Sequence, residues 1–342
     1  MKTLLVVTGP TAVGKTVLCL ELARHYGIPV INADSRQIFR DMKIGTAAPA
    51  EAELRQVRHF FVRELGLDEY YSASMYEQQV LALLERLFQT SDYALLAGGS
   101  MMYIDAVCNG IDDIPTVDDE TRALMKRRLA DEGLEALCEE LRRLDPDHWA
   151  VVDRKNPRRV VHALEICHMT GRTYTSFRVR ERTENGELRT ERYDYTQGES
   201  SSDKSKDNSN HTSHLSPLTS QLGNTSPRPF RIVKIGLNRP REELYERINR
   251  RVDQMMEQGL LDEARRLLPY RHLNALNTVG YKEMFAYLDG IWSLDEAVER
   301  MKGNTRRYAR KQLTWFKRDP MVRWFSPDQK EDIINYIDQQ DD

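Results

Sequence analysis

The sequence lacks both long apolar segments and closely spaced cysteines. No apolar run approaches the roughly 20 residues that a membrane-spanning helix needs, so we expect no membrane-embedded part. The first apolar run, Leu4–Val7, stops at Gly9-Pro10 and is too short for the core of a signal peptide. The four cysteines lie far apart without a Cys-x-x-Cys pair, which argues against a zinc site or a disulfide framework. Together these absences predict a cytoplasmic protein with reduced thiols.

Acidic residues are also absent from one segment, Arg300–Arg318, although acids slightly outnumber bases in the whole chain. The net charge is −3, yet this segment carries eight basic residues, interleaved with Tyr308 and Trp315. A local positive field of this kind suits the phosphates of a nucleic acid. A solvated charged helix face is the alternative explanation, which the complete lack of interspersed acid makes weaker.

What the sequence does contain, in its first hundred residues, is a regular alternation of short apolar runs and amphipathic segments. The runs Thr3–Thr8, Ile28–Ala33 and Tyr93–Ala97 predict buried strands, and the spacing of apolar residues predicts helices over Val17–His25 and Met75–Phe88. Strands that alternate with helices in this order are joined by right-handed crossovers. We therefore expect a parallel sheet that is covered by helices on both faces.

A long excursion separates the third strand from a fourth, predicted at Ile232–Leu237. The segment Gln197–Pro229 holds nine serines and few large aliphatic residues, so burial cannot offset its ordering entropy and we expect a flexible insertion. Further on, Arg241–Leu268 and Leu294–Phe316 are predicted to be helices. The predicted parts in chain order are the first part of the core (1–114), a helical insertion subdomain (115–180), a largely serine-rich flexible insertion (181–230), the completion of the core with basic helices (231–325) and an acidic tail (326–342).

The first predicted strand and helix are joined by a phosphate-binding motif of the form G-x-x-x-x-G-K-[ST]. The residues of this P-loop are Gly9, Pro10, Thr11, Ala12, Val13, Gly14, Lys15 and Thr16. Its backbone N–H groups and the helix N-terminus bind phosphate, Lys15 neutralises phosphate oxygens, and the Thr16 hydroxyl is placed to bind Mg²⁺. The motif and the strand order together predict an α/β fold, a P-loop NTPase-like parallel sheet flanked by helices, with a helical insertion subdomain.

An acidic residue is missing where a P-loop ATPase needs one. The predicted strand Tyr93–Ala97 ends in Gly98-Gly99-Ser100, without the aspartate that organises Mg²⁺ and water for hydrolysis. This favours a transferase in which a phosphorylated small molecule meets an acceptor at the carboxyl ends of the strands. The alternatives are an ATP-dependent small-molecule kinase and, third, a non-enzymatic RNA-binding protein.

Two polar residues follow neighbouring predicted strands. Asp34 can act as a proton acceptor for an incoming nucleophile or hold an acceptor hydroxyl, or it can cap the next helix together with Ser35. Ser100 can donate a hydrogen bond to a bridging or leaving oxygen, or it can be a simple turn serine.

A pair of arginines, Arg247 and Arg251, has the i, i+4 spacing that places both on one side of a helix. Such a pair suits the binding of an anion. The alternative is that these arginines form ion pairs with Glu243 or Asp253.

Taken in order along the chain, the motifs become specific. They are Gly9–Thr16, Asn32-Ala-Asp34-Ser35-Arg-Gln37, Lys43-Ile-Gly-Thr-Ala47, Gly98-Gly-Ser-Met-Met-Tyr103, Asp153–Glu165, Thr278-Val-Gly-Tyr281, and Thr305–Gln312 followed by Thr314-Trp315. This series resembles the tRNA dimethylallyltransferase family, also called the tRNA isopentenyltransferase or IPP transferase family. The resemblance covers most of residues 3–318 apart from the serine-rich insertion.

The resemblance implies transfer of a dimethylallyl group from dimethylallyl diphosphate to N6 of the adenosine 3′ to the anticodon, in tRNAs that read codons beginning with U, with release of diphosphate. It implies that Asp34 takes the N6 proton, that Ser100 and Arg251 stabilise the transition state near the bridging oxygen, and that Mg²⁺ is bound at Thr16. The adenine would be flipped out of the anticodon loop to reach the P-loop. The enzyme is expected to act as a monomer, without a membrane partner.

By the same resemblance, the contacts with the anticodon stem-loop of tRNA map to a wider set of residues. They are Asp34, Ser35, Arg36, Gln37, Ser100, Arg122, Arg158, Arg159, His162, Thr278, Gly280, Lys282, Arg310, Lys311, Gln312, Trp315 and Lys317. Two positions depart from the family pattern, since Ser100 stands where threonine is usual and His162 where arginine is common. The serine hydroxyl keeps the expected chemistry.

Overall fold

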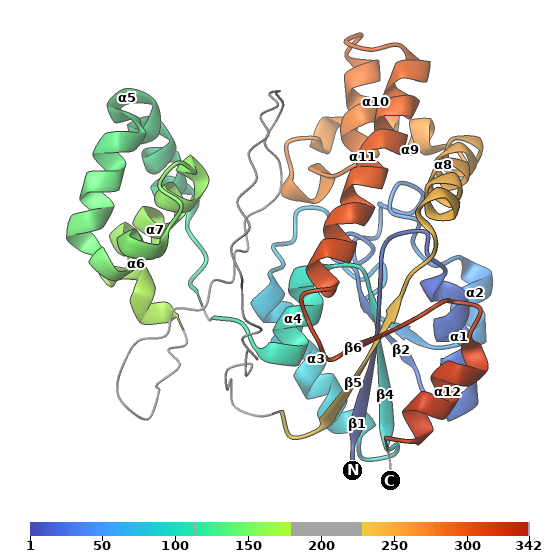
Figure 1. The fold of residues 1–342 in the computed structure, drawn as a ribbon. Coiled ribbons are helices and arrows are strands. Elements are labelled where there is room, and N and C mark those ends of the chain that lie inside the picture. The colour runs from blue at the N-terminus through green and yellow to red at the C-terminus, as the bar shows by residue number, and fades with distance from the viewer. Residues whose placement is uncertain (113, 179–227, 341–342) are drawn as a thin grey trace, which may run out of the picture. The chain divides into compact units, whose positions relative to one another are not determined.

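The computed structural model describes residues 1–112, 114–178 and 228–340, which belong to two compact units (Figure 1). Unit 1 comprises Met1–Gly110 and Arg228–Asp342, and unit 2 comprises Ile111–Pro227. Most of the predicted flexible insertion therefore lies outside the described residues. Within the described ranges, no helix is long and apolar enough to cross a membrane. All four cysteines are described and none of them forms a disulfide.

Unit 1 is built on a parallel sheet with the strand order β3-β2-β4-β1-β5-β6. The strands are β1 (Thr3–Thr8), β2 (Val30–Ala33), β3 (His59–Phe60), β4 (Tyr93–Gly98), β5 (Arg231–Leu237) and β6 (Val322–Phe325). The predicted α/β fold and its four strands are confirmed, with boundaries shifted by two residues or fewer. The edge strands β3 and β6 were not predicted, because β3 has only two residues and in β6 an exposed arginine follows the buried valine.

Helices cover both faces of this sheet (Figure 1). In unit 1 they are α1 (Lys15–Tyr26), α2 (Glu51–Gln56), α3 (Ala73–Leu87), α4 (Met101–Asn109), α8 (Arg241–Glu257), α9 (Leu260–Leu267), α10 (Tyr281–Leu288), α11 (Leu294–Phe316) and α12 (Lys330–Asp338). Helices α1 and α12 pack on one face of the sheet, and α3 and α4 lie together on the other. Helices α8 to α11 lie beyond the carboxyl ends of the strands, the edge at which parallel sheets hold their ligands.

The helices predicted at Val17–His25 and Met75–Phe88 are confirmed as α1 and α3, with ends shifted by one or two residues, but one predicted helix is two in the structure. The predicted helix Arg241–Leu268 is divided into α8 and α9 by Gly259, whose φ of 96° ends the right-handed helix. The prediction was wrong because apolar spacing continues through the glycine, so the pattern alone does not show the break. The other predicted helix in this part, Leu294–Phe316, is confirmed with the same bounds.

Unit 2 is helical over its described residues. It contains α5 (Asp119–Leu144), α6 (Pro146–Val151), α7 (Pro157–Thr170) and the short 3-10 helix η1 (Tyr174–Phe177). Leu137, Leu141, Val160 and Leu164 are fully buried between α5 and α7 and form a small separate core. Gly133 interrupts α5 with a φ of 81°, so that α5 consists of two helical segments with a kink between them.

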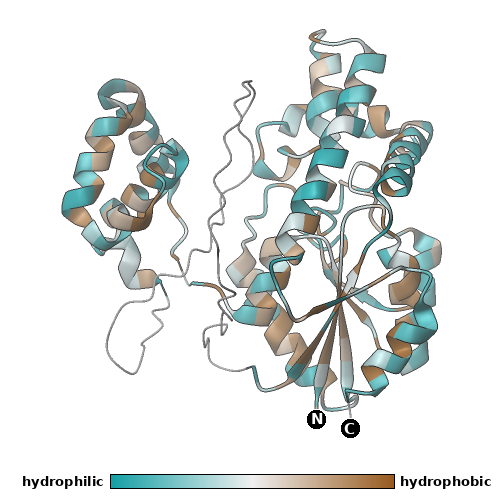
Figure 2. Cartoon of the chain, viewed as in Figure 1, coloured by the Kyte–Doolittle hydropathy of each residue, from teal (hydrophilic) through white to brown (hydrophobic). Residues whose placement is uncertain are grey.

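The acidic segment 326–342 takes part in the main core of unit 1. Its helix α12 buries Ile333, Ile334 and Ile337 against residues of α1 and the sheet, whereas its acidic side chains face outward. Figure 2 shows the same division across unit 1, with hydrophobic strands at the centre and hydrophilic residues on the outer helix faces. Because each Å² of buried apolar surface contributes about 25 cal/mol of stabilisation, this helix stabilises unit 1.

We predict that Ile333→Ala lowers the free energy of unfolding by roughly 2–5 kcal/mol, because it opens a cavity at a fully buried position. Urea denaturation followed by circular dichroism measures the change. Asn335→Ala, at an exposed position of the same helix, is the control and should alter stability by less than about 0.5 kcal/mol. Equal effects of the two substitutions would contradict the packing of α12 in the core.

Candidate active site

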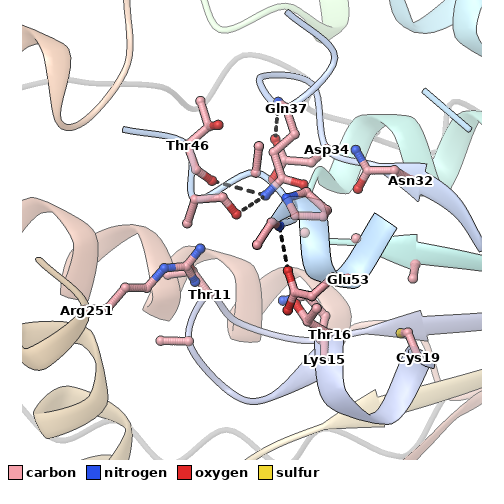
Figure 3. A pocket seen from close by; sticks show the side chains of 18 of the residues that line it. Thr11, Lys15, Thr16, Cys19, Asn32, Asp34, Gln37, Thr46, Glu53 and Arg251 are labelled. Carbon is pink, nitrogen blue, oxygen red and sulfur yellow. Dashed lines mark hydrogen bonds between the residues drawn. The ribbon is translucent and has the colours of Figure 1, made fainter. Parts of the chain in front are cut away.

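A cavity of about 760 Å³ opens in unit 1 at the carboxyl ends of β1, β2 and β4 (Figure 3). Its walls are the P-loop, the segment after β2, the loop that contains Lys43–Ala50, and the inward faces of α8 and α11. Figure 3 shows Arg251 on one side of this cavity and Asp34 on the other, with Lys15 and Thr16 at the start of α1. The structure thus brings together the predicted phosphate-binding loop and the predicted proton acceptor.

The P-loop has the backbone that an anion site requires. Gly9 and Gly14 have φ values of 144° and 117°, and a Cβ atom at Gly9 would lie 2.6 Å from the carbonyl oxygen of Leu237. The Lys15 ammonium donates to the carbonyl oxygens of Gly9 and Pro10 at 2.9 and 2.8 Å. Burial, and then the nearby Arg251, lowers the pKa of Lys15 to about 8. A bound anion would raise this pKa again by favouring the charged form, so the site favours a negatively charged ligand.

The two arginines of α8 contact the P-loop directly. Arg247 donates to the carbonyl oxygen of Ala12 at 2.9 Å, and Arg251 donates to the Thr11 hydroxyl at 3.2 Å. The alternative of ion pairs with Glu243 or Asp253 is wrong, because these acids pair with Arg239 and Lys302 instead.

Arg251 carries a positive charge without a carboxylate partner among the described residues. Burial lowers the pKa of its guanidinium, and no carboxylate of residues 1–112, 114–178 or 228–340 forms an ion pair with it. Within the part of the chain that the structure describes, its direct polar partner is the neutral Thr11 hydroxyl. Because a partly buried charge is costly without a counter-charge, this position favours a phosphate group in the cavity.

The Asp34 carboxylate is held at one oxygen and open at the other. Its Oδ1 atom accepts hydrogen bonds from the N–H groups of Arg36 and Gln37 at 2.9 and 3.3 Å. The helix cap considered from the sequence is absent, because residues 35–38 form a turn and the next helix begins only at Glu51; the bonds to Oδ1 close this turn instead. The Oδ2 atom has no hydrogen-bond partner among the described residues and remains able to accept a proton.

Ser100 contacts the Asp34 segment. It is 8% exposed, and its Oγ atom accepts from the Ser35 N–H at 2.8 Å and donates to the Ser35 hydroxyl at 3.1 Å. Ser100 is not one of the residues that line the cavity. In this structure the serine ties the end of β4 to the residue after Asp34.

Gln312 links two parts of the site that are distant in the sequence. Its Oε1 atom accepts from the Thr11 N–H at 2.9 Å, and its Nε2 atom donates to the Gly99 carbonyl at 2.8 Å. A Cβ atom at position 99 would lie 2.5 Å from that Nε2 atom, so a larger residue there would displace the Gln312 amide from its bonds. The sequence indicated Gln312 only as a tRNA contact. The basic residues around it give no sign that its side chain is buried or that it bridges two parts of the site.

Two further residues of the site were missed by sequence analysis. Tyr308 lines the cavity, and burial together with the nearby Asp34 carboxylate raises its pKa. Glu263 is 2% exposed and accepts hydrogen bonds from the Ile44 and Gly45 N–H groups and from the Tyr281 hydroxyl, which fixes the loop at the cavity wall. Its position in a charged amphipathic helix resembles that of an ordinary surface acid, so the sequence gives no signal for this role.

The other predicted tRNA-binding residues are divided between the two units. In unit 1, Gln37 lines the cavity and donates to the Thr46 and Ala47 carbonyls, while Trp315 donates to Asp105 at 2.7 Å. Unit 1 also contains Ser35, Arg36, Thr278, Gly280, Lys282, Arg310, Lys311 and Lys317, whereas Arg122, Arg158, Arg159 and His162 belong to α5 and α7 of unit 2.

A metal ion held by protein ligands alone does not fit this site. The described residues contain no cluster of three or more histidine, cysteine, aspartate or glutamate side chains that could hold one. Thr16, however, is exposed at the cavity beside Lys15. Since Mg²⁺ is commonly held by substrate phosphates, waters and one or two protein oxygens, Thr16 fits a Mg²⁺ ion that arrives with a phosphorylated ligand.

Comparisons with known proteins identify the family of this chain. The model of the IPP transferase family matches residues 37–206 and 208–319. A protein of Phocaeicola vulgatus named tRNA dimethylallyltransferase 1 is 55% identical over 98% of this chain and 97% of its own length. The protein of the same name from Bacteroides thetaiotaomicron is 52% identical over 98% and 96%. The crystal structure of the full-length tRNA isopentenylpyrophosphate transferase from Bacillus halodurans matches with a TM-score of 0.64 and 31% identity, covering 99% of this chain and 96% of that one.

We predict that Gln312→Leu lowers the free energy of unfolding by roughly 1–3 kcal/mol and weakens binding of inorganic diphosphate, because it leaves the Thr11 N–H and the buried Gly99 carbonyl unpaired. Urea denaturation and titration calorimetry measure the two effects. Thr314→Ala, at an exposed position of the same helix, should change neither. Unaltered stability and binding in the leucine variant would show that the bridge is dispensable.

Proposed function

Because the chain belongs to the IPP transferase family, we infer that it is a tRNA dimethylallyltransferase, and we propose dimethylallyl diphosphate as its donor. The proposed acceptor is N6 of the adenosine 3′ to the anticodon in tRNAs that read codons beginning with U. The observation that carries this proposal is the placement of Asp34 and the P-loop on one cavity without an ATPase aspartate at the end of β4. The named relatives give no support to the alternative of an ATP-dependent kinase.

The donor diphosphate would occupy the P-loop. Its oxygens would accept from the loop N–H groups, from Lys15 and from Arg251, whose charge has no carboxylate partner in the described residues. Negative charge grows on the diphosphate as the allylic carbon–oxygen bond breaks, so these donors bind the transition state more tightly than the ground state. Thr16 would hold the proposed Mg²⁺, which supplies further charge neutralisation on the leaving group.

The acceptor nitrogen would meet the allylic carbon next to Asp34. As the new carbon–nitrogen bond forms and the carbon–oxygen bond breaks, N6 loses a proton to Asp34 Oδ2 and diphosphate departs. The two N–H bonds to Oδ1 fix the direction of the carboxylate, and Ser100 supports this turn through Ser35. The placement of Ser100 at the bridging oxygen stays a prediction.

The anticodon loop would approach over the basic surface of α11. Arg310, Lys311 and Lys317 are exposed there, while Tyr308 from the same helix reaches the cavity that would receive the flipped adenine. Arg122, Arg158, Arg159 and His162 of unit 2 are the further proposed contacts. We propose that the enzyme acts as a monomer in the cytoplasm, where its tRNA substrates are found.

We predict that Asp34→Asn lowers kcat for transfer of label from dimethylallyl diphosphate to unmodified tRNA by at least about 100-fold. Asparagine keeps an acceptor for the two N–H groups but cannot take up the proton, so tRNA binding should change by less than about twofold. Asp41→Asn, an exposed acid nearby, serves as the control. If the wild-type enzyme instead moves phosphate from labelled ATP to a small acceptor, the proposed function is wrong.

We predict that replacing Arg310 and Lys311 together by glutamine weakens tRNA binding and makes the slope of log K against log salt concentration less negative by about 2. The physical reason is the loss of two phosphate contacts with their counterion release. Filter binding at several salt concentrations measures the slope. Arg323→Gln, an exposed cation on β6, should leave it unchanged, and an equal change in that variant would argue against a specific surface on α11.

A further inference from the structure

The turn between β6 and α12 lies directly against the P-loop. If Gly14 carried a Cβ atom, that atom would be 3.3 Å from the Cβ of Pro327 and 3.8 Å from the Arg239 guanidinium. The residue that precedes Arg239, Asn238, donates its N–H to the carbonyl oxygen of Phe325. The end of β5 and the turn after β6 therefore support the loop with residues that do not line the cavity.

Arg239 is the centre of this support. Its Nε atom donates to the carbonyl oxygen of Val13 at 2.9 Å. Its Nη1 and Nη2 atoms donate to the two carboxylate oxygens of Asp328, both at 3.0 Å, and Nη1 also donates to Glu243 at 2.8 Å. The arginine side chain is 12% exposed and that of Asp328 is 71% exposed. The acid thus orients a guanidinium that is itself nearly buried against the loop.

This contact has a consequence for phosphate binding because a peptide group is planar. The Val13 carbonyl and the Gly14 N–H belong to the same peptide and point in opposite directions. When Arg239 holds the carbonyl oxygen outward, it directs the Gly14 N–H toward the interior of the loop. In P-loops these inward N–H groups are the ligands of the phosphate.

We propose that Arg239 and Asp328 are positioning residues, which set the Val13–Gly14 peptide for binding the diphosphate of the donor. Arg239 acts on the ligand through the loop backbone, and Asp328 acts through Arg239. The proposal rests on the proposed function for the identity of the donor. It gives the segment after β6 a role in donor binding in addition to its role in the core.

The first test measures the Michaelis constants of both substrates in the variants Asp328→Ala and Arg239→Gln. We expect each to raise KM for dimethylallyl diphosphate roughly three- to tenfold, with KM for tRNA unchanged, because the hydrogen bonds of the pair go to the loop, to Glu243 and to Ser326, none of which is a predicted tRNA contact. Asp328→Glu, which keeps the charge, should restore most of the affinity. Glu331→Gln, at an exposed position just beyond the turn, is the matched control.

The second test examines whether the two residues act as one unit. The double variant should raise KM for the donor no more than Arg239→Gln alone, since Asp328 has no effect without its arginine. Titration with inorganic diphosphate, which needs no turnover, should show the same ratios of affinity. Urea denaturation confirms that Asp328→Ala remains folded.

The outcomes separate the inference from the proposed function. Active wild-type enzyme with unchanged donor KM and diphosphate affinity in both variants would overturn the inference alone. Equal increases in the KM values of donor and tRNA would also overturn it, because they would indicate a general loss of structure. A wild-type enzyme that transfers no dimethylallyl group would overturn the proposed function, whereas the diphosphate titration would still test the contact.

Discussion

An anion site made of backbone N–H groups requires a loop in which these groups point inward. This direction needs positive φ values, which most residues avoid. The Gly9–Thr16 loop meets this requirement with positive φ values at Gly9, Ala12 and Gly14, and the alanine among them has no glycine freedom to make that conformation easy. Side chains from distant segments hold the loop. Arg247 donates to the Ala12 carbonyl and Gln312 accepts from the Thr11 N–H, so α8 and α11 together hold the middle of this loop.

Much of the central sheet could be predicted from the sequence because its strands are buried on both faces. The runs at β1 and β4 are continuously apolar for that reason, and the P-loop motif fixes which strand precedes the first helix. The edge strands could not be predicted, since β3 has two residues and β6 alternates a buried valine with an exposed arginine. Short edge strands owe their conformation to their neighbour in the sheet, which local sequence does not reveal.

In the site, too, features set by a local motif could be predicted, whereas features set by tertiary contacts could not. Asp34 and Lys15 could be placed near one another because both follow strands at the carboxyl edge of the sheet, whereas Arg251 was placed at the site only through the family resemblance. The partners of the arginines could not be chosen, because Glu243 and Asp253 have suitable spacing on α8 but are engaged by Arg239 and Lys302. Glu263 acts on a loop more than 200 residues earlier in the chain, and no local pattern identifies such a contact.

The pairing of β1 with β5 also determines when the sheet can form during translation. Thr3–Thr8 lies between β4 and β5, and its second partner is synthesised only after more than 200 further residues. At typical elongation rates this delay is on the order of ten seconds or more. The helices of unit 2 are complete before β5 leaves the ribosome, so they can fold first. Until β5 is synthesised, β1 has one unpaired edge, which is open to pairing with a strand of another chain.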